Sequence, residues 1–377
     1  MKLLGYQRLY WWMAFCAGMA AVLVLAFGLR DSESAVPLPD AIVQLPDAAS
    51  GPGSPAAGST STPNAGLAEE SREAAASALS SDVVEARSLL GGLRISVYLS
   101  ETAQIERLPL ELYVRGVLAG EMPAEFELEA LKAQAIAART YAIRYLRAHG
   151  AGAEAGGSDI TDTVQHQVYV PLAELADAWP ADKSAAYLRK LSQAVRETRG
   201  IIATYEGEPI EASFFSTSAG RTENAEDYWS AAIPYLRSVA SPWDAAIAPR
   251  ADAELELSAG ELADKLGIRK KDLAKLRIAA HTAGGAVARV EAGDHTWSGR
   301  EIRELLGLDS SHFTWRSSGQ RWSIVTRGYG HGVGMSQWGA NGMAREGYMA
   351  EQILAHYYTG IRLETLDTPS ATNETAH

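Results

Sequence analysis

The sequence predicts an α+β fold, in which helices and strands mix without strict alternation. Residues 93–99 alternate apolar and polar side chains, as a half-buried strand does. Two helical patterns follow, at 110–120 and 127–148, and Pro109 suits the start of the first. We therefore expect one mixed α+β unit over residues 86–365, which could divide into two lobes around a groove. Further strands are expected at 201–205, 211–215, 287–291 and 322–327, and helices at 188–198, 258–266, 337–345 and 350–357.

An uncharged apolar run occupies positions 9–29 near the N-terminus. As a helix it would be about 31 Å long, enough to cross a hydrocarbon core of about 30 Å. Lys2 and Arg8 precede the run and acidic residues follow it, so the positive-inside rule leaves residues 1–8 in the cytoplasm. A cleaved signal peptide is the alternative, although its apolar region usually has only about 7–15 residues. We expect a single-pass transmembrane helix in the cell membrane, with the folded unit outside.

Residues 30–85 are rich in Pro, Ala, Ser and Gly. Such a composition cannot bury enough apolar surface to fold, and the repeated prolines interrupt any helix. This segment is therefore expected to be a disordered tether between the membrane helix and the folded unit. Residues 366–377 are expected to form a flexible polar tail.

Composition excludes several kinds of binding site. The net charge of −12 leaves no basic surplus with which to bind a nucleic acid. The single cysteine, Cys16, lies in the apolar run, so the folded unit has neither disulfides nor a thiolate metal site. The histidines between His149 and His356 show no pairing at metal-ligand spacing. We expect no metal and no cofactor.

Glu121 is the residue to which we assign the chemistry. Because Pro123 disfavours the helical conformation at Met122, the preceding helix should end near Glu121, where the helix dipole penalises a charged carboxylate. Nearby glutamates would raise the pKa of Glu121 further, as a general acid requires. They are Glu125, Glu127 and Glu129. Taken alone, the pattern also fits a solvated glutamate at a helix end.

Two long segments of the chain resemble the stage II sporulation protein D family. The first covers residues 111–142 and includes the Glu-Met-Pro sequence that begins at Glu121. The second comprises residues 328–340, GYGHGVGMSQWGA, and residues 356–360, HYYTG. Shorter similar stretches lie between them in the family's order, at 161–169, 214–224 and 234–239. The resemblance covers roughly residues 90–365, and residues 86–365 would then be the catalytic domain.

The resemblance implies a peptidoglycan lytic transglycosylase with Glu121 as its catalytic acid and base. Such an enzyme cleaves the bond between N-acetylmuramic acid and N-acetylglucosamine in peptide-stripped glycan strands and leaves a 1,6-anhydro end. The resemblance also implies cell-wall remodelling during forespore engulfment, in complex with a sporulation amidase similar to stage II protein P and a membrane scaffold similar to stage II protein M.

Two other activities remain open at this point. A hydrolase would need a second carboxylate, for which the candidates are Asp159, Asp162 and Glu223. The related amidase enhancers suggest instead a wall-binding activator of an amidase, in which Glu121 contributes to glycan binding without catalysis.

Several residues could bind the glycan around Glu121. Lys132 and Arg139 lie two turns apart on one helix face and could pair with lactyl carboxylates, although a solvated structural face is equally compatible. The glycines between 328 and 334 would let the backbone approach a ligand closely. The full set of expected substrate-binding residues is Lys132, Gln134, Arg139, Thr140, Tyr141, His331, Ser336 and Gln337.

Some of these residue types have a more ordinary explanation. Tyr141, Tyr169 and Trp338 could stack on sugar rings, but buried core positions are the commoner fate of aromatic side chains. His331 could likewise be a packed, hydrogen-bonded histidine. Ser216 and Ser218 lack a nucleophile motif and are expected in a structural turn.

Overall fold

The computed structural model describes residues 93–163, 165–249 and 251–366. The expected membrane helix at 9–29 and tether at 30–85 lie outside the described residues, as does the expected tail except for its first residue, Leu366. Within the described ranges, no helix is both long enough and apolar enough to cross a membrane.

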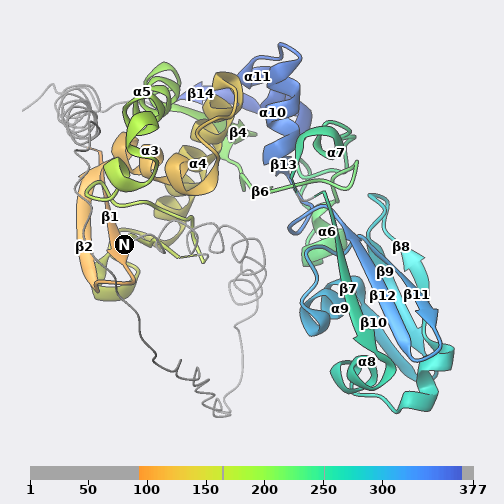
Figure 1. The fold of residues 1–377 in the computed structure, drawn as a ribbon. Helices are drawn as coiled ribbons and strands as arrows, with labels where there is room; N and C mark the ends of the chain where they lie inside the picture. Colours follow the sequence, from red (N-terminus) through yellow and green to blue (C-terminus); the bar gives the residue numbers. More distant parts are fainter. Residues whose placement is uncertain (1–92, 164, 250, 367–377) are drawn as a thin grey trace, which may run out of the picture.

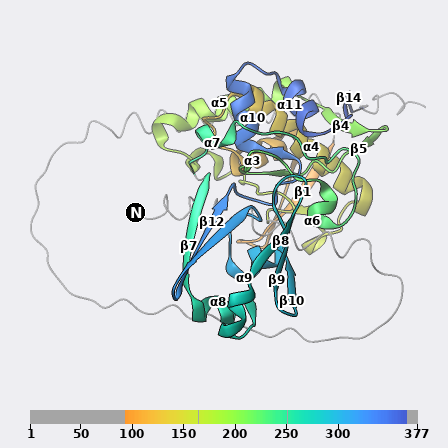
Figure 2. The ribbon, with the colours of Figure 1, turned by 90° about the vertical axis from the view of Figure 1, so that its right-hand side faces the viewer.

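The described chain has the expected α+β composition and packs around two large hydrophobic cores. One core unites residues before 250 with those after 328, and we call this part the first lobe. The other core forms entirely within residues 251–327, the second lobe. The second lobe extends from the first in Figures 1 and 2. Its sequence thus separates the two long motifs, yet both motifs belong to the first lobe.

The first lobe opens with an antiparallel hairpin. Strand β1 (Arg94–Leu99) pairs with β2 (Gln104–Pro109), and β3 (Ile160–Thr161) joins β1 in parallel. Ile95 and Val97 are buried on β1, as the alternating pattern predicts. Helix α3 (Leu110–Glu121) begins directly after Pro109, so the expected first helix is confirmed.

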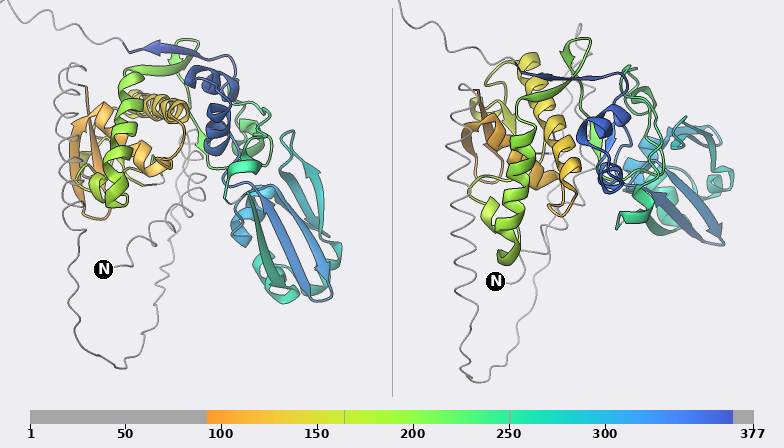
Figure 3. Two further views of the ribbon diagram at one scale, coloured as in Figure 1. Left: turned by 45° about the horizontal axis from the view of Figure 1, so that its top comes forward. Right: turned by 90° about the horizontal axis from the view of Figure 1, so that it is seen from above.

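Helix α4 (Leu128–His149) is the central element of the first lobe (Figure 3). It contacts α3, α5 (Ala181–Glu197), α10 (Gln337–Arg345) and α11 (Ala350–Tyr357). Its buried surface is largely alanine, which lets the neighbouring helices approach closely. The expected helices at 127–148, 337–345 and 350–357 are therefore confirmed. Helix α5 begins seven residues before the expected 188, because its first seven residues lack apolar periodicity.

Two small sheets complete the first lobe. Strand β4 (Ile201–Tyr205) lies between β5 (Glu208–Pro209) and β14 (Arg362–Thr365). Strand β6 (Phe214–Phe215) pairs in parallel with β13 (Met335–Ser336). Only two residues of the expected strand at 211–215 form this ladder, because the partner segment turns at its glycines before Met335. The remaining short elements are α6 (Ala225–Trp229), α7 (Asp244–Ile247) and the 3₁₀ turns Ala155–Gly157 and Leu175–Asp177.

The second lobe has two three-stranded antiparallel sheets, in the orders β11-β12-β7 and β10-β9-β8. Its strands are β7 (Asp252–Ser258), β8 (Arg277–His281), β9 (Val287–Ala292), β10 (His295–Ser298), β11 (Phe313–Ser318) and β12 (Arg321–Arg327). Its helices are α8 (Ala259–Leu266), the 3₁₀ helix Lys270–Lys275 and α9 (Gly299–Leu306). The expected strands at 287–291 and 322–327 and the helix at 258–266 are confirmed.

Helices α8 and α9 begin in the same way. Ser258 and Ser298 each accept a hydrogen bond from the backbone N–H three residues on, and the glutamate at that position reaches back to the serine N–H. Such a capping box satisfies two backbone donors at a helix start. Each helix ends on a left-handed glycine, Gly267 or Gly307. Local sequence signals therefore mark both ends of α9, although this helix was not among those expected from the sequence.

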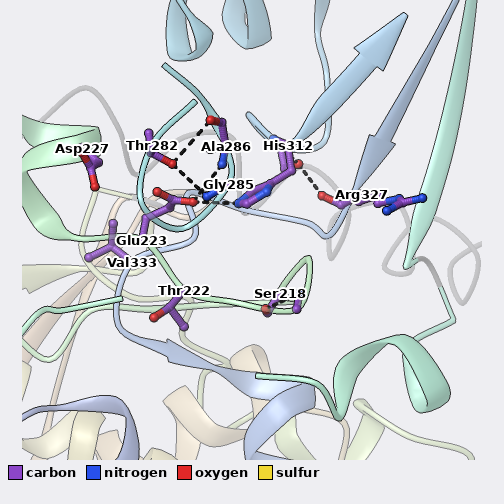
Figure 4. Close-up of polar contacts among 12 residues, drawn as sticks. Ser218, Thr222, Glu223, Asp227, Thr282, Gly285, Ala286, His312, Arg327 and Val333 are labelled. Atoms are coloured by element: carbon purple, nitrogen blue, oxygen red, sulfur yellow. Dashed lines mark hydrogen bonds and ion pairs between the residues drawn. The ribbon is translucent and has the colours of Figure 1, made fainter. Parts of the chain in front are cut away.

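Glu223 joins the two lobes (Figure 4). Its buried Oε1 accepts the backbone N–H of Ala286 (3.2 Å) and lies 2.9 Å from Nε2 of His312, both in the second lobe. Gly284 of the second lobe packs directly against this part of the first lobe. A Cβ on Gly284 would lie 2.3 Å from Glu223 Oε1 and 2.5 Å from the carbonyl oxygen of Thr222. The junction therefore requires a glycine at position 284.

We predict that Gly284→Ala loosens this junction and lowers the free energy of unfolding by about 1–3 kcal/mol, because backbone must move to relieve the overlap. Thermal melts of the purified protein measure the effect. The matched control is Gly260→Ala in α8, where the nearest atom to an added Cβ is 3.8 Å away. That variant should melt at or above the wild-type temperature, since alanine favours helix. Equal melting temperatures for the two variants would contradict the contact.

Candidate active site

Glu121 is the last residue of α3, as the sequence predicts. The next residue, Met122, is extended (φ −129°, ψ 143°), which is the conformation that a following proline imposes. The backbone N–H of Met122 still donates to the carbonyl of Leu118 at 3.1 Å. The helix therefore ends immediately beyond Glu121, with the glutamate side chain at its negative end.

The Glu121 carboxyl is buried, with 1% of its surface exposed. Its Oε1 accepts the backbone N–H of Val168 at 2.9 Å, while Oε2 has no hydrogen-bond partner within the described residues. Burial raises the pKa of Glu121 well above its ordinary value, although the Val168 N–H and the Gln337 amide act in the opposite direction. The neutral acid is therefore favoured, and its proton belongs on Oε2 because Oε1 is already an acceptor.

The raised pKa has a different cause from the one that the sequence suggests. Glu125 is exposed and accepts a hydrogen bond from the Tyr187 hydroxyl (2.7 Å), and Glu129 pairs with Lys132. Desolvation of the carboxyl is the largest cause, and none of the three neighbouring glutamates contributes. The expected direction is thus right, but the expected role of the acidic neighbours is wrong.

Close packing on α3 brings the Val168 N–H to Glu121. A Cβ on Gly120 would lie 2.7 Å from Cγ1 and 2.9 Å from the carbonyl oxygen of Val168, and one on Gly116 would lie 2.2 Å from the Tyr169 ring. The two glycines thus let the extended segment lie directly against the helix. Any larger residue would move this backbone donor away from the carboxyl.

The two long motifs meet at the same place. Gln337, the first residue of α10, donates its Nε2–H to the carbonyl oxygen of Glu121 at 3.0 Å, across 216 residues of sequence. The last carbonyls of a helix lack partners within the helix, so this bond satisfies one of them. Of the expected binding residues, Gln337 is the one with a hydrogen bond to Glu121; the bond is to the backbone carbonyl, and the same amide lies close enough to the carboxyl to oppose the rise in its pKa.

Tyr113 belongs to the site but was not among the predicted residues. Its hydroxyl donates to Oε1 of Gln167 (3.0 Å), and its pKa is raised by burial and then by the proximity of Glu121. Tyr113 and Glu121 are eight residues apart, which places them on one helix face. That spacing was the available signal. A neutral phenol therefore lies close to the buried acid.

Asp244, also not predicted, holds α10 in position. It is fully buried and accepts hydrogen bonds from the Ser218 N–H (2.8 Å), the Ser241 hydroxyl (2.7 Å) and the Ser336 hydroxyl. Burial raises the pKa of Asp244 despite these donors. Ser336 also caps α10 by accepting the Gly339 N–H (3.2 Å). Ser336 thus has a structural role next to Gln337.

His331 is packed and hydrogen-bonded. Its Nε2 lies 3.0 Å from the carbonyl oxygen of Phe214, and its Nδ1 accepts the Val333 N–H at 3.1 Å. Burial, followed by the charge of Arg303, lowers the pKa of His331 to about 3, so the ring is neutral at ordinary pH. These contacts favour the packed histidine over a ligand contact.

The glycine run approaches its own chain. A Cβ on Gly334 would lie 2.0 Å from the Ser213 carbonyl oxygen, and one on Gly330 would lie 2.8 Å from Cβ of Phe215. Both glycines have positive φ angles, 82° and 117°. These two glycines therefore let their segment pack against the one that carries β6, and the approach of the glycine run to a ligand stays a prediction.

Both expected cations are paired with glutamates. Nζ of Lys132 lies 2.7 Å from Glu129 and 2.5 Å from Glu197. Arg139 is 0% exposed and makes a two-bond pair with Glu111, at 2.8 and 2.5 Å. Their role in glycan binding stays a prediction that these contacts do not favour.

The other expected binding residues are also largely internal. Thr140 bonds the Ile136 carbonyl and the Ala203 N–H, Tyr141 is half-buried, and Gln134 is fully buried with no partner for its amide within the described residues. Tyr169 is buried, bonded to Glu106 and stacked on Tyr113, so the core alternative holds for it. Trp338 is half-buried, with its ring 4.7 Å from that of Phe126.

The candidate second carboxylates all have partners of their own. Asp159 accepts bonds from Ser96 and Gly152, Asp162 accepts one from the Ser100 N–H, and Glu223 contacts the second lobe. Ser218 accepts the Gly220 N–H (2.9 Å), which confirms the expected turn. Among the residues that the structure places, no group of three or more His, Cys, Asp or Glu could hold a metal ion.

We predict that Glu121→Gln stabilises the protein increasingly as pH rises. The folded state raises the pKa of Glu121, so above about pH 4.5 the unfolded chain ionises this group first and the native state loses stability. Glutamine still accepts the Val168 N–H but does not ionise. Melting curves should therefore coincide near about pH 4 and diverge toward about pH 8, with the variant more stable. The exposed control Glu125→Gln should show no such divergence; a pH-independent difference for Glu121→Gln would refute the shift.

Comparison with known proteins identifies the family. The family model described as stage II sporulation protein matches residues 98–205. The chain is 46% identical to stage II sporulation protein D of Bacillus subtilis (strain 168) over 274 residues, 72% of this chain and 79% of the relative. It is 46% identical to the protein of that name from Bacillus amyloliquefaciens over 275 residues, with 73% and 79% covered. A more distant relative is the amidase enhancer of Bacillus subtilis (strain 168), 28% identical over 308 residues, 66% of this chain and 40% of the relative. The chain is therefore a sporulation protein that belongs to the stage II sporulation protein D family.

Proposed function

We propose that this chain is a membrane-anchored lytic transglycosylase that cleaves peptidoglycan glycan strands during sporulation, with Glu121 as its single acid and base. The observation that carries the proposal is the buried Glu121 carboxyl, whose pKa is raised and whose Oε2 has no partner within the described residues. A general acid must hold its proton near neutral pH, and desolvation is the usual means.

The reaction needs one carboxyl group in two roles. Glu121 first gives its Oε2 proton to the glycosidic oxygen as the bond from C1 of N-acetylmuramic acid to N-acetylglucosamine breaks. The resulting carboxylate then takes the proton of the muramic C6 hydroxyl, whose oxygen forms the new bond to C1. The products are a 1,6-anhydro end and a free N-acetylglucosamine hydroxyl, and Glu121 is protonated again.

The surroundings of Glu121 suit this cycle. Val168 holds Oε1 throughout, which fixes the orientation of Oε2. The glycan can reach Oε2 only when the side chains that cover it move, because Glu121 is 1% exposed. The cycle therefore includes an opening step on substrate binding. Hydrolysis is less well supported, since each candidate second carboxylate is engaged elsewhere.

A second function, activation of an amidase, is supported by the 28% identity to the amidase enhancer and by the burial of Glu121. In that case the chain would bind glycan without cleaving it. The proposed setting is the same for both functions. Residues 9–29 anchor the chain, and the linker of about 50 residues gives the domain a reach of about 40 Å toward the wall. An amidase similar to stage II protein P and a scaffold similar to stage II protein M would act beside it.

We predict that the purified full chain releases 1,6-anhydro ends from peptide-stripped strands, and that Glu121→Gln lowers this rate by about 10²–10⁴-fold, because the acid and base are lost. Mass spectrometry of the products measures the ends. Glu125→Gln is the matched control, four residues away and exposed, and should retain the wild-type rate. Peptide-bearing strands test the dependence on amidase treatment.

Each alternative gives a different product pattern. Strand binding without cleavage by the wild type would support the amidase activator and refute catalysis. Reducing ends in place of anhydro ends would indicate hydrolysis. Equal anhydro release by Glu121→Gln and the wild type would remove Glu121 from the mechanism.

A further inference from the structure

A glycan stripped of its peptides exposes the lactyl carboxylate of each muramic acid, and a protein that binds it needs local cations. Lys132 and Arg139 are both engaged with glutamates, which does not favour them in this role. A different cation, Arg345, lies in the last turn of α10, the helix whose first residue bonds Glu121. It is exposed and has no ion-pair partner within the described residues.

Arg345 shares one face of α10 with Trp338. Residues 338, 342 and 345 have the i, i+4, i+7 spacing of a single helical stripe, which spans about 10 Å. Position 342 is a glycine, and a Cβ there would lie 2.3 Å from Cβ of Trp243. Trp243 therefore sits directly on the stripe between Trp338 and Arg345.

These side chains expose aromatic surface. Trp338 and Trp243 are half-buried, and Tyr348 is 39% exposed. The rings of Trp243 and Tyr348 lie 6.4 Å apart at an interplanar angle of 70°. We call Trp338, Trp243, Tyr348 and Arg345 the α10 face. Aromatic rings with an apolar body and a polar rim are suited to sugar rings, which have one relatively apolar surface.

The α10 face begins beside the candidate acid. The Trp338 ring packs against Phe126, five residues after Glu121, and the preceding Gln337 donates to the Glu121 carbonyl. From Gln337 to Arg345 the helix rises by about 12 Å, the length of a few sugar rings. A strand lying on the α10 face would therefore run from Arg345 toward the end of the helix that contacts Glu121, and a glycosidic bond would reach Oε2 once the opening step uncovers it.

We propose that the α10 face binds the glycan strand, with Trp338 and Trp243 against sugar rings and the Arg345 guanidinium paired with a lactyl carboxylate. This inference rests on the proposed function, since it concerns the same substrate. The group that Arg345 recognises is a negatively charged sugar substituent on an N-acetylated glycan. Two exposed glutamates lie nearby: Glu346 follows Arg345 in sequence, and Glu127 lies on the facing loop. The pairing of Arg345 with a lactyl carboxylate therefore depends on the position of Arg345 and not on an overall positive surface.

The test removes the charge of Arg345 and the charge of the ligand carboxylates, singly and together, and measures strand binding each time. All proteins carry Glu121→Gln so that no strand is cleaved. The full chain with Arg345 intact or replaced by Gln is titrated with peptide-stripped strands and with the same strands after amidation of their carboxyl groups. We expect amidation to weaken binding to intact Arg345 by about fivefold, the size of an exposed ion pair, and Arg345→Gln to do the same. Once Arg345 is replaced, amidation should have no further effect.

Three controls make the result specific. Arg316→Gln removes an exposed arginine of β11 in the second lobe and should leave the binding of both ligands unchanged. Trp338→Ala should weaken native and amidated strands equally, because stacking is independent of the carboxylate, and Trp338→Phe should recover part of this loss. Raised salt should reduce the Arg345 effect, since the pair is exposed.

The outcomes separate this inference from the proposed function. An amidation effect that persists at full size in Arg345→Gln would overturn the pairing, as would an equal loss on Arg316→Gln, whether or not the wild type releases anhydro ends. If the amidation effect disappears in Arg345→Gln but the protein with Glu121 intact releases no anhydro ends, glycan binding by the α10 face would be supported and catalysis refuted. Absence of any strand binding would overturn the inference directly.

Discussion

The buried end of α3 is the constraint on which the site depends. A carboxyl that is 1% exposed at the negative end of a helix is stable only if its charge is suppressed and the last helical carbonyls find donors. Val168 supplies a donor to the side chain, and Gln337 supplies one to the carbonyl. They come from positions 47 and 216 residues away, so the site forms only when the first lobe has assembled.

Glycines make these long-range contacts possible. Gly116 and Gly120 let the Val168 segment lie against α3, and Gly330 and Gly334 let the chain before α10 lie against residues 213–218. A side chain at any of these positions would displace backbone, and with it a donor to Glu121. From the sequence, the glycine run was expected to contact a ligand directly. In the structure, Gly330 and Gly334 pack against their own chain and so position α10, whose first residue contacts Glu121.

How much the sequence predicts depends on the range of the interactions. Helices α3, α4, α10 and α11 follow from local periodicity and Pro123, which also located Glu121 at a helix end. Most other features of the site required tertiary structure. Nothing local indicates that Val168 donates to Glu121, or that Arg139 is neutralised by Glu111 across 28 residues. The sequence does not distinguish an arginine or lysine that is buried in an ion pair from one that is exposed to a ligand.

The electrostatics of the acid explain why a substrate-binding cation should lie elsewhere. A cation in contact with Glu121 would stabilise its carboxylate and lower the pKa that burial has raised. In this structure, Lys132 and Arg139, the cations of the helix that follows, are each held by glutamates. Arg345 is exposed, lies about 12 Å along α10 from Gln337 and is not among the groups that shift the pKa of Glu121. On the proposed function, recognition of a charged strand by Arg345 and retention of a proton on Glu121 are compatible because the two groups lie at different places in the fold.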